Sequence, residues 1–300
     1  MKTLEELVNT MDRTTPKNVA VAQAADEEVL KAVKMARDSN LADFLLVGDK
    51  GDIENKAQAV GLDLTQGGIS VVHASHYETA RTAVKAVHDG EAHVVMKGQI
   101  DTKSLLKAVL DKEYGLRKGS VLSHVALFEI PGRDKLIFLT DSAMNITPSL
   151  QEKTQIIENA VEVAVHAGWN CPKVAMLAAV EVVNPAMEAT QDAAIVTQMN
   201  RRGQIKGCIV DGPLAFDNAV DPKAAEQKGV TSEVAGQADI LVVPSIEVAN
   251  ALYKSFIYFA KGKVAGVISG AKAPIVLTSR ADNAQSKIYS LALALKASQQ

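Results

Sequence analysis

Near one end of the chain, an apolar segment is followed at once by a group of small polar and charged residues. After the apolar residues 274–277, the sequence reads T-S-R-A-D-N over residues 278–283, and an amphipathic segment follows. A strand ending here and a helix beginning here would place hydroxyl groups and a guanidinium beside free backbone N–H groups, which is a common anion site. The planar guanidinium of Arg280 suits a phosphate group. A purely local role is also open, with Ser279 or Asp282 capping the helix and Arg280 pairing with a surface acid.

A second polar group falls on a predicted helix over residues 246–261. Asn250, Tyr253 and Lys254 are spaced at i, i+3 and i+4, so they share one helix face. They would place an amide, a phenol and an ammonium group together on a helix that directly follows a buried strand. Ligands of open α/β sheets bind at such strand ends. An ordinary solvent-facing surface would carry the same residues, so both interpretations stay open.

Three more polar segments begin where predicted strands end. They are 96–102 with Lys97 and Gly98, 141–148 with Asp141 and Asn145, and 211–217 with Asp211. Gly98 would let a ligand approach the backbone closely. Each segment alone is equally well explained as a turn or a helix cap. Because the carboxyl ends of parallel strands meet at one edge of a sheet, we expect all five polar groups to line that edge.

The elements that must position these groups alternate along the chain. Short apolar runs predict strands over residues 18–22, 43–47, 69–73, 93–96, 121–130, 135–140, 173–178, 207–210, 239–243, 264–269 and 274–278. Helical patterns fall over residues 26–39, 77–89, 102–111, 149–167, 188–202, 246–261 and 283–297. Continuous apolar strands separated by helices are typical of an α/β fold with mostly parallel sheets. One short Pro-Gly turn joins two adjacent strands and predicts an antiparallel hairpin, and therefore a mixed sheet.

Composition excludes several classes of protein. The 300 residues include 32 Lys and Arg against 35 Asp and Glu, for a net charge of -3. This balance argues against a nucleic-acid-binding protein, and no apolar run reaches the ~20 residues that a membrane helix needs. A chain of this length tends to form two domains, with the joint predicted at 141–148 and the ligand site in a cleft between the lobes. We expect a cytoplasmic protein whose two cysteines, Cys171 and Cys208, are free thiols.

The common nucleotide, metal and nucleophile motifs are absent from the sequence. There is no GxGxxG, GxxxxGK[ST], HExxH or GxSxG pattern. Those patterns mark dinucleotide sites, P-loops, zinc proteases and nucleophile elbows. His73 and His76 lack the further Cys or His residues that would complete a zinc shell, so they are interpreted as surface or capping residues. We therefore predict neither a metal site nor a bound cofactor.

Taken together, the quoted segments resemble the phosphate acetyl/butyryl transferase family. The resemblance rests on D-G-P-L-A-F-D at 211–217, A-D-I-L-V-V-P at 238–244, A-N-A-L-Y-K at 249–254 and the Ser279-Arg280 pair, in this order and at these spacings. It covers most of the chain. The segment at 96–102 and the compact length favour the butyryl-transferring members over the acetyl-transferring ones.

The resemblance implies a two-domain α/β fold like that of isocitrate and isopropylmalate dehydrogenases, with the active site in the interdomain cleft. It implies a first domain of residues 1–142 plus 271–300 and a second of residues 143–270. The implied activity is reversible transfer of a short acyl group between coenzyme A and inorganic phosphate. Coenzyme A is then a substrate and not a cofactor. The family also implies a homo-oligomer.

The resemblance further implies a division of roles among the candidate residues. Ser279, Arg280 and Lys254 would hold the phosphate, and Arg280 would also stabilise the oxyanion while the coenzyme A thiolate attacks the acyl carbonyl directly. Substrate contacts would come from Lys97, Gly98, Asp141, Asn145, Asp211, Asn250 and Tyr253. No covalent acyl-enzyme is needed.

The base that removes the thiol proton is not assigned by this resemblance. The acetyltransferases carry an aspartate six residues beyond the motif arginine, and this chain has Ser286 there. Asp282, Asp211 and a phosphate oxygen of the substrate are the alternatives.

Two other functions are weighed against this one. A nicotinamide-linked decarboxylating dehydrogenase of the same fold would need a metal-binding set of acids, and the sequence has no such cluster. A non-catalytic protein that binds acyl phosphates or other anions would need the anion site but no thiol activation. Within the family, a phosphate acetyltransferase is the alternative to a butyryltransferase, because the acyl pocket and the adenine site of coenzyme A cannot be placed from the sequence.

Overall fold

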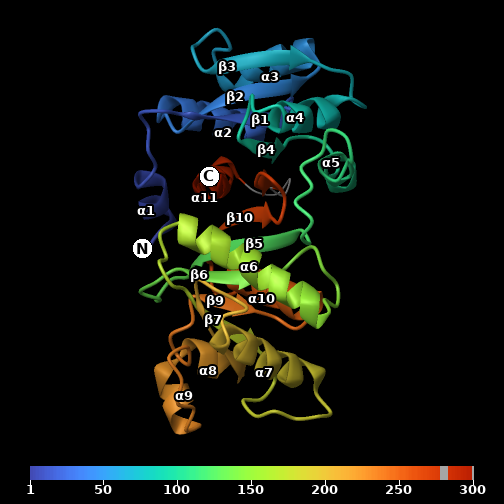
Figure 1. The fold of residues 1–300 in the computed structure, drawn as a ribbon. Coiled ribbons are helices and arrows are strands. Elements are labelled where there is room, and N and C mark those ends of the chain that lie inside the picture. Colours follow the sequence, from blue (N-terminus) through green and yellow to red (C-terminus); the bar gives the residue numbers. More distant parts are fainter. Residues whose placement is uncertain (278–282, 299–300) are drawn as a thin grey trace. The chain divides into compact units, whose positions relative to one another are not determined.

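The chain folds into two compact α/β units (Figure 1). The computed structural model describes residues 1–277 and 283–298. We call Leu4–Ser120 with Ala265–Gln300 the N-terminal unit, and Met1–Thr3 with Val121–Val264 the central unit. The predicted boundaries, after residues 142 and 270, differ from those of the structure, which fall after residues 120 and 264.

The N-terminal unit is a mostly parallel sheet with helices packed on it. Its strands are β1 (Lys17–Ala22), β2 (Ala42–Gly48), β3 (Ile69–His73), β4 (Val94–Lys97), β10 (Lys263–Ser269, which begins just before the boundary) and β11 (Ile275–Val276). Its helices are α1 (Leu4–Asn9), α2 (Glu27–Asp38), α3 (Lys50–Val60), α4 (Thr79–His88), α5 (Thr102–Val109) and α11 (Ala284–Ala297). The strand order is β3-β2-β1-β4-β11-β10, and β10 alone runs antiparallel to its neighbour β11.

The central unit contains both parallel and antiparallel strand pairs and has its own helices. Its strands are β5 (Ser123–Glu129), β6 (Ile137–Thr140), β7 (Lys173–Leu177), β8 (Ile209–Leu214) and β9 (Ile240–Val242). Its helices are α6 (Leu150–His166), α7 (Glu188–Arg201), α8 (Phe216–Val220), α9 (Pro222–Gln227) and α10 (Ile246–Tyr258). The order is β5-β6-β9-β7-β8, with β5 antiparallel to β6 and the other pairs parallel. The predicted hairpin is therefore confirmed, and it belongs to this unit because β6 pairs with β9.

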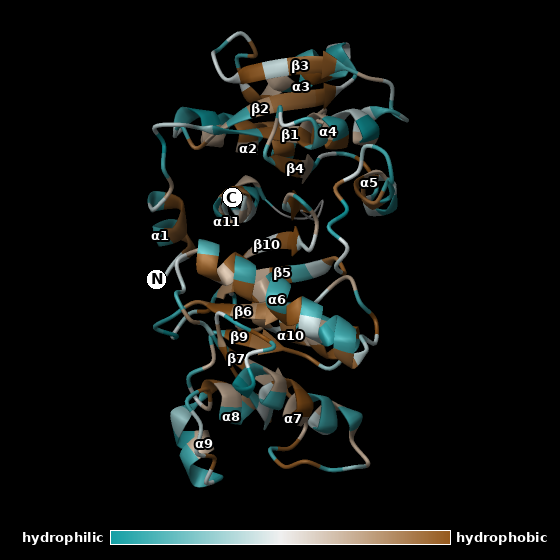
Figure 2. Cartoon of the chain, in the orientation of Figure 1, coloured by the Kyte–Doolittle hydropathy of each residue, from teal (hydrophilic) through white to brown (hydrophobic). Residues whose placement is uncertain are grey.

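The strands are buried because their side chains are apolar on both faces, as the continuous runs predicted. Figure 2 shows these strands in brown, whereas α6 carries both brown and teal stretches. In the central core, Phe128 of β5, Leu139 of β6 and Leu241 of β9 have no exposed surface. The sheet thus forms a rigid base for the loops that follow its strands.

Helix caps fix where the chain turns from loop to helix. Asp101 caps α5 by accepting a hydrogen bond from the backbone N–H of Ser104, at 2.8 Å. Ser149 and Glu152 form a capping box at the start of α6. Such caps satisfy backbone N–H groups that lack helical partners, typically for about 1 kcal/mol each.

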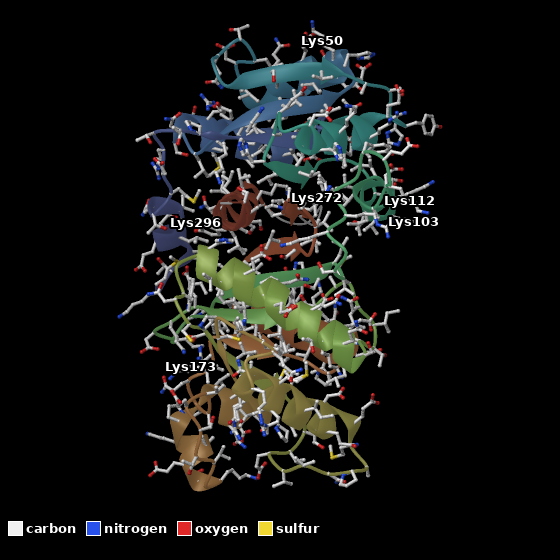
Figure 3. The ribbon with its side chains drawn as sticks, viewed as in Figure 1. Lys50, Lys103, Lys112, Lys173, Lys272 and Lys296 are labelled. Atoms are coloured by element: carbon white, nitrogen blue, oxygen red, sulfur yellow. The ribbon has the colours of Figure 1, made fainter. Side chains whose placement is uncertain are left out.

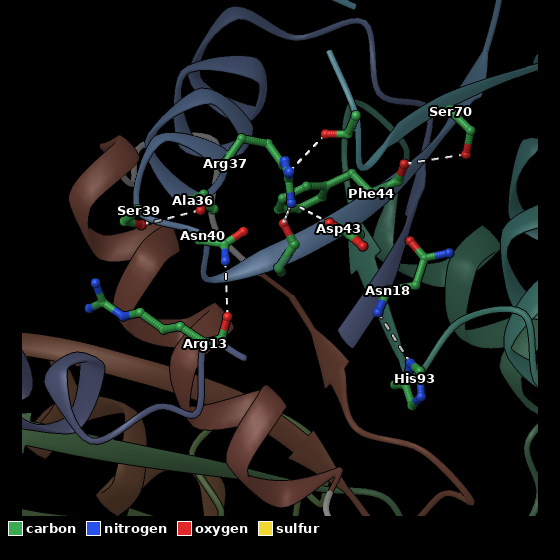
Figure 4. A network of polar contacts seen from close by, with 12 residues as sticks. Arg13, Asn18, Ala36, Arg37, Ser39, Asn40, Asp43, Phe44, Ser70 and His93 are labelled. Atoms are coloured by element: carbon green, nitrogen blue, oxygen red, sulfur yellow. Dashed lines mark hydrogen bonds and ion pairs between the residues drawn. The ribbon is translucent and has the colours of Figure 1, made fainter. Parts of the chain in front are cut away.

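One arginine ties helix α2 to the neighbouring strand and loop in the N-terminal unit (Figure 4). Arg37 donates to the carbonyl of Ala42 at 2.9 Å, to the carbonyl of Gly67 at 2.7 Å, and to the carboxylate of Asp43. These contacts close the turn between α2 and β2. The network is structural, because every partner belongs to this turn or to the loop before β3.

Four segments differ from their sequence prediction, and two of them are the short helices α8 and α9, which were not predicted. Helix α3 was missed, since only Ile53 and Ala57 of it are buried and its apolar pattern is correspondingly weak. Strand β8 was predicted to end at residue 210 but continues to Leu214, which pairs with Leu177 of β7 after a shift in register. An edge strand tolerates the proline at position 213, because no neighbour needs its missing N–H.

Candidate functional site

The centre of the candidate site is the turn that follows β6. Asp141 is only 3 % exposed, and its carboxylate accepts five hydrogen bonds. Oδ1 accepts from the backbone N–H groups of His124, Ala143 and Met144 at 3.0–3.1 Å. Oδ2 accepts from the backbone N–H of Asn145 at 2.9 Å and from its side-chain Nδ2 at 2.6 Å. A carboxylate has about four lone-pair sites. The protein occupies them, so the geometry favours Asp141 as an anchor of the turn over a direct substrate contact.

Asn145 connects this turn to the beginning of β5. Its Nδ2 donates to the carbonyl of Leu122 at 2.9 Å as well as to Asp141. The predicted substrate-binding amide is therefore already used as a donor within the turn, while its partly exposed position leaves its oxygen near solvent. The sequence correctly placed both residues after a strand, and the structure brings them into direct contact.

A buried histidine of β5 pairs with a serine of this turn, and sequence reasoning missed both. His124 Nδ1 lies 2.6 Å from the hydroxyl oxygen of Ser142, and the two residues are 8 % and 3 % exposed. Thr140 donates its hydroxyl to the carbonyl of His124 at 3.0 Å and so fixes the backbone of the histidine. The available signal was a histidine inside an otherwise apolar predicted strand, since a buried polar side chain needs a partner.

The polar face of α10 adjoins this pair. The ring of Tyr253 packs against His124 with 6.1 Å between ring centroids, and against the edge of Phe128 at 5.2 Å. Lys254 Nζ lies 5.4 Å from the centroid of the Tyr253 ring. Lys254 and Asn250 are exposed, whereas Tyr253 is half-buried. Tyr253 thus adjoins the His124–Ser142 pair, and Lys254 lies next to the ring of Tyr253.

Asp211 lies away from this group. It sits inside β8 and not after it, and β8 is separated from β6 by β9 and β7. Three strand spacings amount to about 14 Å. It forms an ion pair with Arg201 of α7, at 4.0 Å. The prediction that the segment 211–217 starts at a strand end is wrong, because pairing with β7 extends the strand.

Lys97 and Gly98 end strand β4 in the N-terminal unit. Figure 3 labels Lys50, Lys103 and Lys112, which are exposed as lysines ordinarily are. Lys97 is instead only 7 % exposed, and its ammonium donates to the carbonyl of Gly98 at 3.3 Å. A buried ammonium at a strand end keeps Lys97 a strong candidate for binding an anion.

The glycine after it has a structural explanation. A Cβ at Gly98 would lie 2.1 Å from the backbone oxygen of Gln23, at the end of the adjacent strand β1. The backbone N–H groups of Gly98 and Gln99 donate to the carbonyls of Ala22 and Gln23 at 2.9 and 2.7 Å. Close packing of two strand ends therefore requires glycine here, whether or not a ligand also approaches.

The remaining predicted residues, Ser279, Arg280 and Asp282, lie outside the described residues. The structure does describe the helix that follows them. Asn283 caps α11 and accepts from the backbone N–H of Ser286 at 2.9 Å. The N-cap of α11 is therefore Asn283.

The described part of the chain was searched for metal sites and membrane spans. Over residues 1–277 and 283–298, no group of three or more His, Cys, Asp or Glu side chains could hold a metal ion. No helix among the same residues is long and apolar enough to cross a membrane.

The two cysteines differ in reactivity. Burial raises the pKa of the Cys208 thiol to about 12, with smaller contributions from Cys171 and Glu158. The thiol therefore stays protonated at neutral pH, and thiols in that state are poor nucleophiles. Cys171 is exposed.

We expect the native protein to show one fast-reacting thiol with DTNB at pH 8, and the second only in denaturant. The substitution Cys171→Ser should abolish the fast phase. Two fast thiols in the native protein would contradict the burial of Cys208.

The chain is similar to known proteins over nearly its whole length. The family model described as "Phosphate acetyl/butaryl transferase" matches residues 2–83 and 76–295. A protein of Bacillus subtilis named "Probable phosphate butyryltransferase" is 56 % identical over 299 residues, covering 99 % of this chain and 98 % of that one. The crystal structure of a branched-chain phosphotransacylase from Enterococcus faecalis has a TM-score of 0.81 at 36 % identity, over 95 % and 99 % of the two chains. A 4-hydroxythreonine-4-phosphate dehydrogenase from Burkholderia phymatum, with a TM-score of 0.53 at 16 % identity over 94 % and 97 %, shares the fold alone.

Proposed function

Because this chain belongs to the phosphate acetyl/butyryl transferase family, we propose that it moves a butyryl group reversibly between coenzyme A and inorganic phosphate. One observation carries the proposal: a relative named as a butyryltransferase is 56 % identical across nearly the whole of both chains. The fold adds support, since the candidate residues follow the carboxyl ends of strands, where α/β enzymes bind ligands.

In the proposed reaction, the sulfur of coenzyme A attacks the carbonyl carbon of butyryl phosphate. The C–O bond to phosphate then breaks, inorganic phosphate leaves, and the thioester remains. The resemblance assigns Ser279, Arg280 and Lys254 to the phosphate, and it assigns Arg280 to the developing oxyanion. Preorganised donors of this kind are worth several kcal/mol, because charge develops next to them in the transition state. Cys208 has no role in this route, since its thiol is protonated and buried.

The other candidate residues divide into two proposed roles. Lys97, Tyr253 and Asn250 are proposed to contact substrate, because Lys97 places a buried ammonium at a strand end and α10 has a polar face. Asp141 is proposed to hold the turn in which Ser142 and Asn145 lie. Gly98 is accounted for by strand packing and Asp211 by its place in β8, so neither is needed as a direct ligand.

Phosphate acetyltransferase activity is the alternative within the family, and its chemistry is the same with a shorter acyl group. A cytoplasmic location, a homo-oligomeric state and the absence of a bound cofactor stay predictions of the sequence.

The proposal is tested by adding phosphate to butyryl-CoA and the purified protein, and following free coenzyme A with DTNB. We expect release that depends on phosphate and stops when sulfate replaces it. Release without phosphate would indicate thioester hydrolysis. A flat trace with acetyl-, propionyl- and butyryl-CoA alike would leave only the anion-binding alternative.

A further inference from the structure

Strand β5 holds a buried titratable group beside the turn after β6, and the family resemblance gives this group no role. His124 is 8 % exposed, and its Nδ1 lies 2.6 Å from the Ser142 hydroxyl. Its backbone is fixed on both sides, by its N–H to Asp141 and by its carbonyl from Thr140. Five hydrogen bonds to Asp141 hold the turn that carries Ser142, so the pair is preorganised and not a chance surface contact.

One of the two tautomers that this contact allows has the protonation pattern that a general base needs. When Nδ1–H donates to the Ser142 oxygen, the second ring nitrogen, Nε2, carries the lone pair. A hydrogen bond at one nitrogen commonly selects the tautomer at the other in this way.

Among the described residues, titratable groups of Asp141 and Tyr253 adjoin His124 from the elements packed around it. The Asp141 carboxylate faces its backbone from the turn, and the ring of Tyr253 packs on its imidazole from α10. Lys254 lies beyond that ring, with its ammonium 5.4 Å from the ring centroid. Tyr253 and Lys254 are the residues proposed above to contact substrate, so the imidazole lies next to the proposed substrate-binding residues.

We propose that His124 is the base that accepts the proton of the coenzyme A thiol, an inference that rests on the proposed acyl transfer. The lone pair on Nε2 takes the S–H proton, and the S–H electron pair becomes the attacking lone pair on sulfur. Sulfur bonds to the carbonyl carbon, the C–O bond to phosphate breaks with its electrons on oxygen, and His124 is left as imidazolium. In the reverse direction the same imidazolium returns its proton to the departing thiolate.

The described alternatives to His124 are weaker. The Asp141 carboxylate is filled by five donors, and Asp211 lies three strands away. Ser286 occupies the family's aspartate position but has a hydroxyl, which is not a base at neutral pH. General bases typically accelerate such a step by 10²–10⁴-fold.

The test compares the wild-type protein and His124→Gln in the direction that consumes coenzyme A and butyryl phosphate. At pH 7 we expect kcat for the variant to fall by about 10²-fold or more, with the KM for butyryl phosphate little changed. The thiol of coenzyme A has a pKa near ~8.5, so its thiolate fraction rises about thirtyfold between pH 7 and pH 9.5. The ratio of wild-type kcat to variant kcat should therefore be smaller by about this factor at pH 9.5 than at pH 7, because a thiol that is already deprotonated needs no base.

Two further variants separate a chemical role from a structural one. Ser142→Ala keeps the imidazole but removes its orienting partner, and we expect a smaller loss that also shrinks at high pH. His166→Gln is the matched control. His166 is the last residue of α6, and at about 1.5 Å per residue it lies roughly 24 Å from Leu150, where this helix begins after the turn. Its activity and pH profile should match the wild type.

The possible results separate an error in the assignment of the base from an error in the proposed function. Full activity of His124→Gln at pH 7, or a deficit of equal size at pH 7 and pH 9.5, would overturn the inference. If His124→Gln does not fold, Ser142→Ala supplies the test. A dependence of its kcat on pH that runs parallel to that of the wild type would also overturn the inference. An inactive wild-type protein would contradict the proposed function itself, and is thereby distinguished from failure of the base assignment.

Discussion

Replacing Arg280 with alanine is expected to lower kcat by about two to three orders of magnitude while the protein stays folded. The resemblance places this guanidinium on the phosphate and the oxyanion, and removing one such donor typically costs 10²–10³-fold. Arg280→Lys should recover only a small part, because an ammonium cannot reproduce the planar, two-point contact. The measurement is phosphate-dependent release of coenzyme A from butyryl-CoA at saturating substrate, together with the far-UV circular dichroism of each variant.

Arg202→Ala provides the matched control. Arg202 is exposed at the end of α7, and its loss should leave kcat unchanged. If Arg280→Ala keeps wild-type turnover, the anion-binding role of this segment is wrong.

Replacing Asp141 with alanine is expected to reduce both stability and activity. Five donors lose a buried acceptor at once, and hydrogen bonds to a charged group contribute about 1.5–3 kcal/mol each before the site relaxes. After water enters the site, we expect a net loss of about 3–4 kcal/mol in the free energy of unfolding. This corresponds to a Tm lower by roughly 6–15 °C. Activity should fall as well, because the turn positions Ser142 and Asn145.

Asp134→Ala is the control for this carboxylate. Asp134 is exposed in the β5–β6 turn, so its replacement should change stability by less than about 0.5 kcal/mol. Thermal melts followed by circular dichroism give both values. An Asp141→Ala protein that melts with the wild type would show that the turn does not depend on the carboxylate.

The sheet could be predicted from the sequence because buried strands carry continuous apolar runs. Each of the eleven predicted runs overlaps a strand of the structure, including the antiparallel pair β5 and β6. Asp141 and Lys97 were placed correctly at strand ends, since a strand pattern that stops leaves the next polar residue at the sheet edge.

Packing details were beyond the sequence pattern. His124 was counted within a strand, and its pairing with Ser142 depends on how the chain closes the hairpin 18 residues later. Asp211 was misplaced because the bulged pairing of β8 with β7 extends the strand past an apparent Gly-Pro stop. Gly98 was interpreted as a ligand contact, whereas the carbonyl of Gln23 explains why no side chain fits there.

The account is tested most directly by the ratio of kcat/KM for butyryl-CoA to that for acetyl-CoA in the phosphate-dependent reaction. Each methylene recognised by an apolar pocket is worth about 10-fold or more, and butyryl carries two more than acetyl. We expect a ratio of at least about ten in favour of butyryl-CoA. A ratio below one would identify an acetyl-transferring enzyme, and no phosphate-dependent turnover with either thioester would contradict acyl transfer altogether.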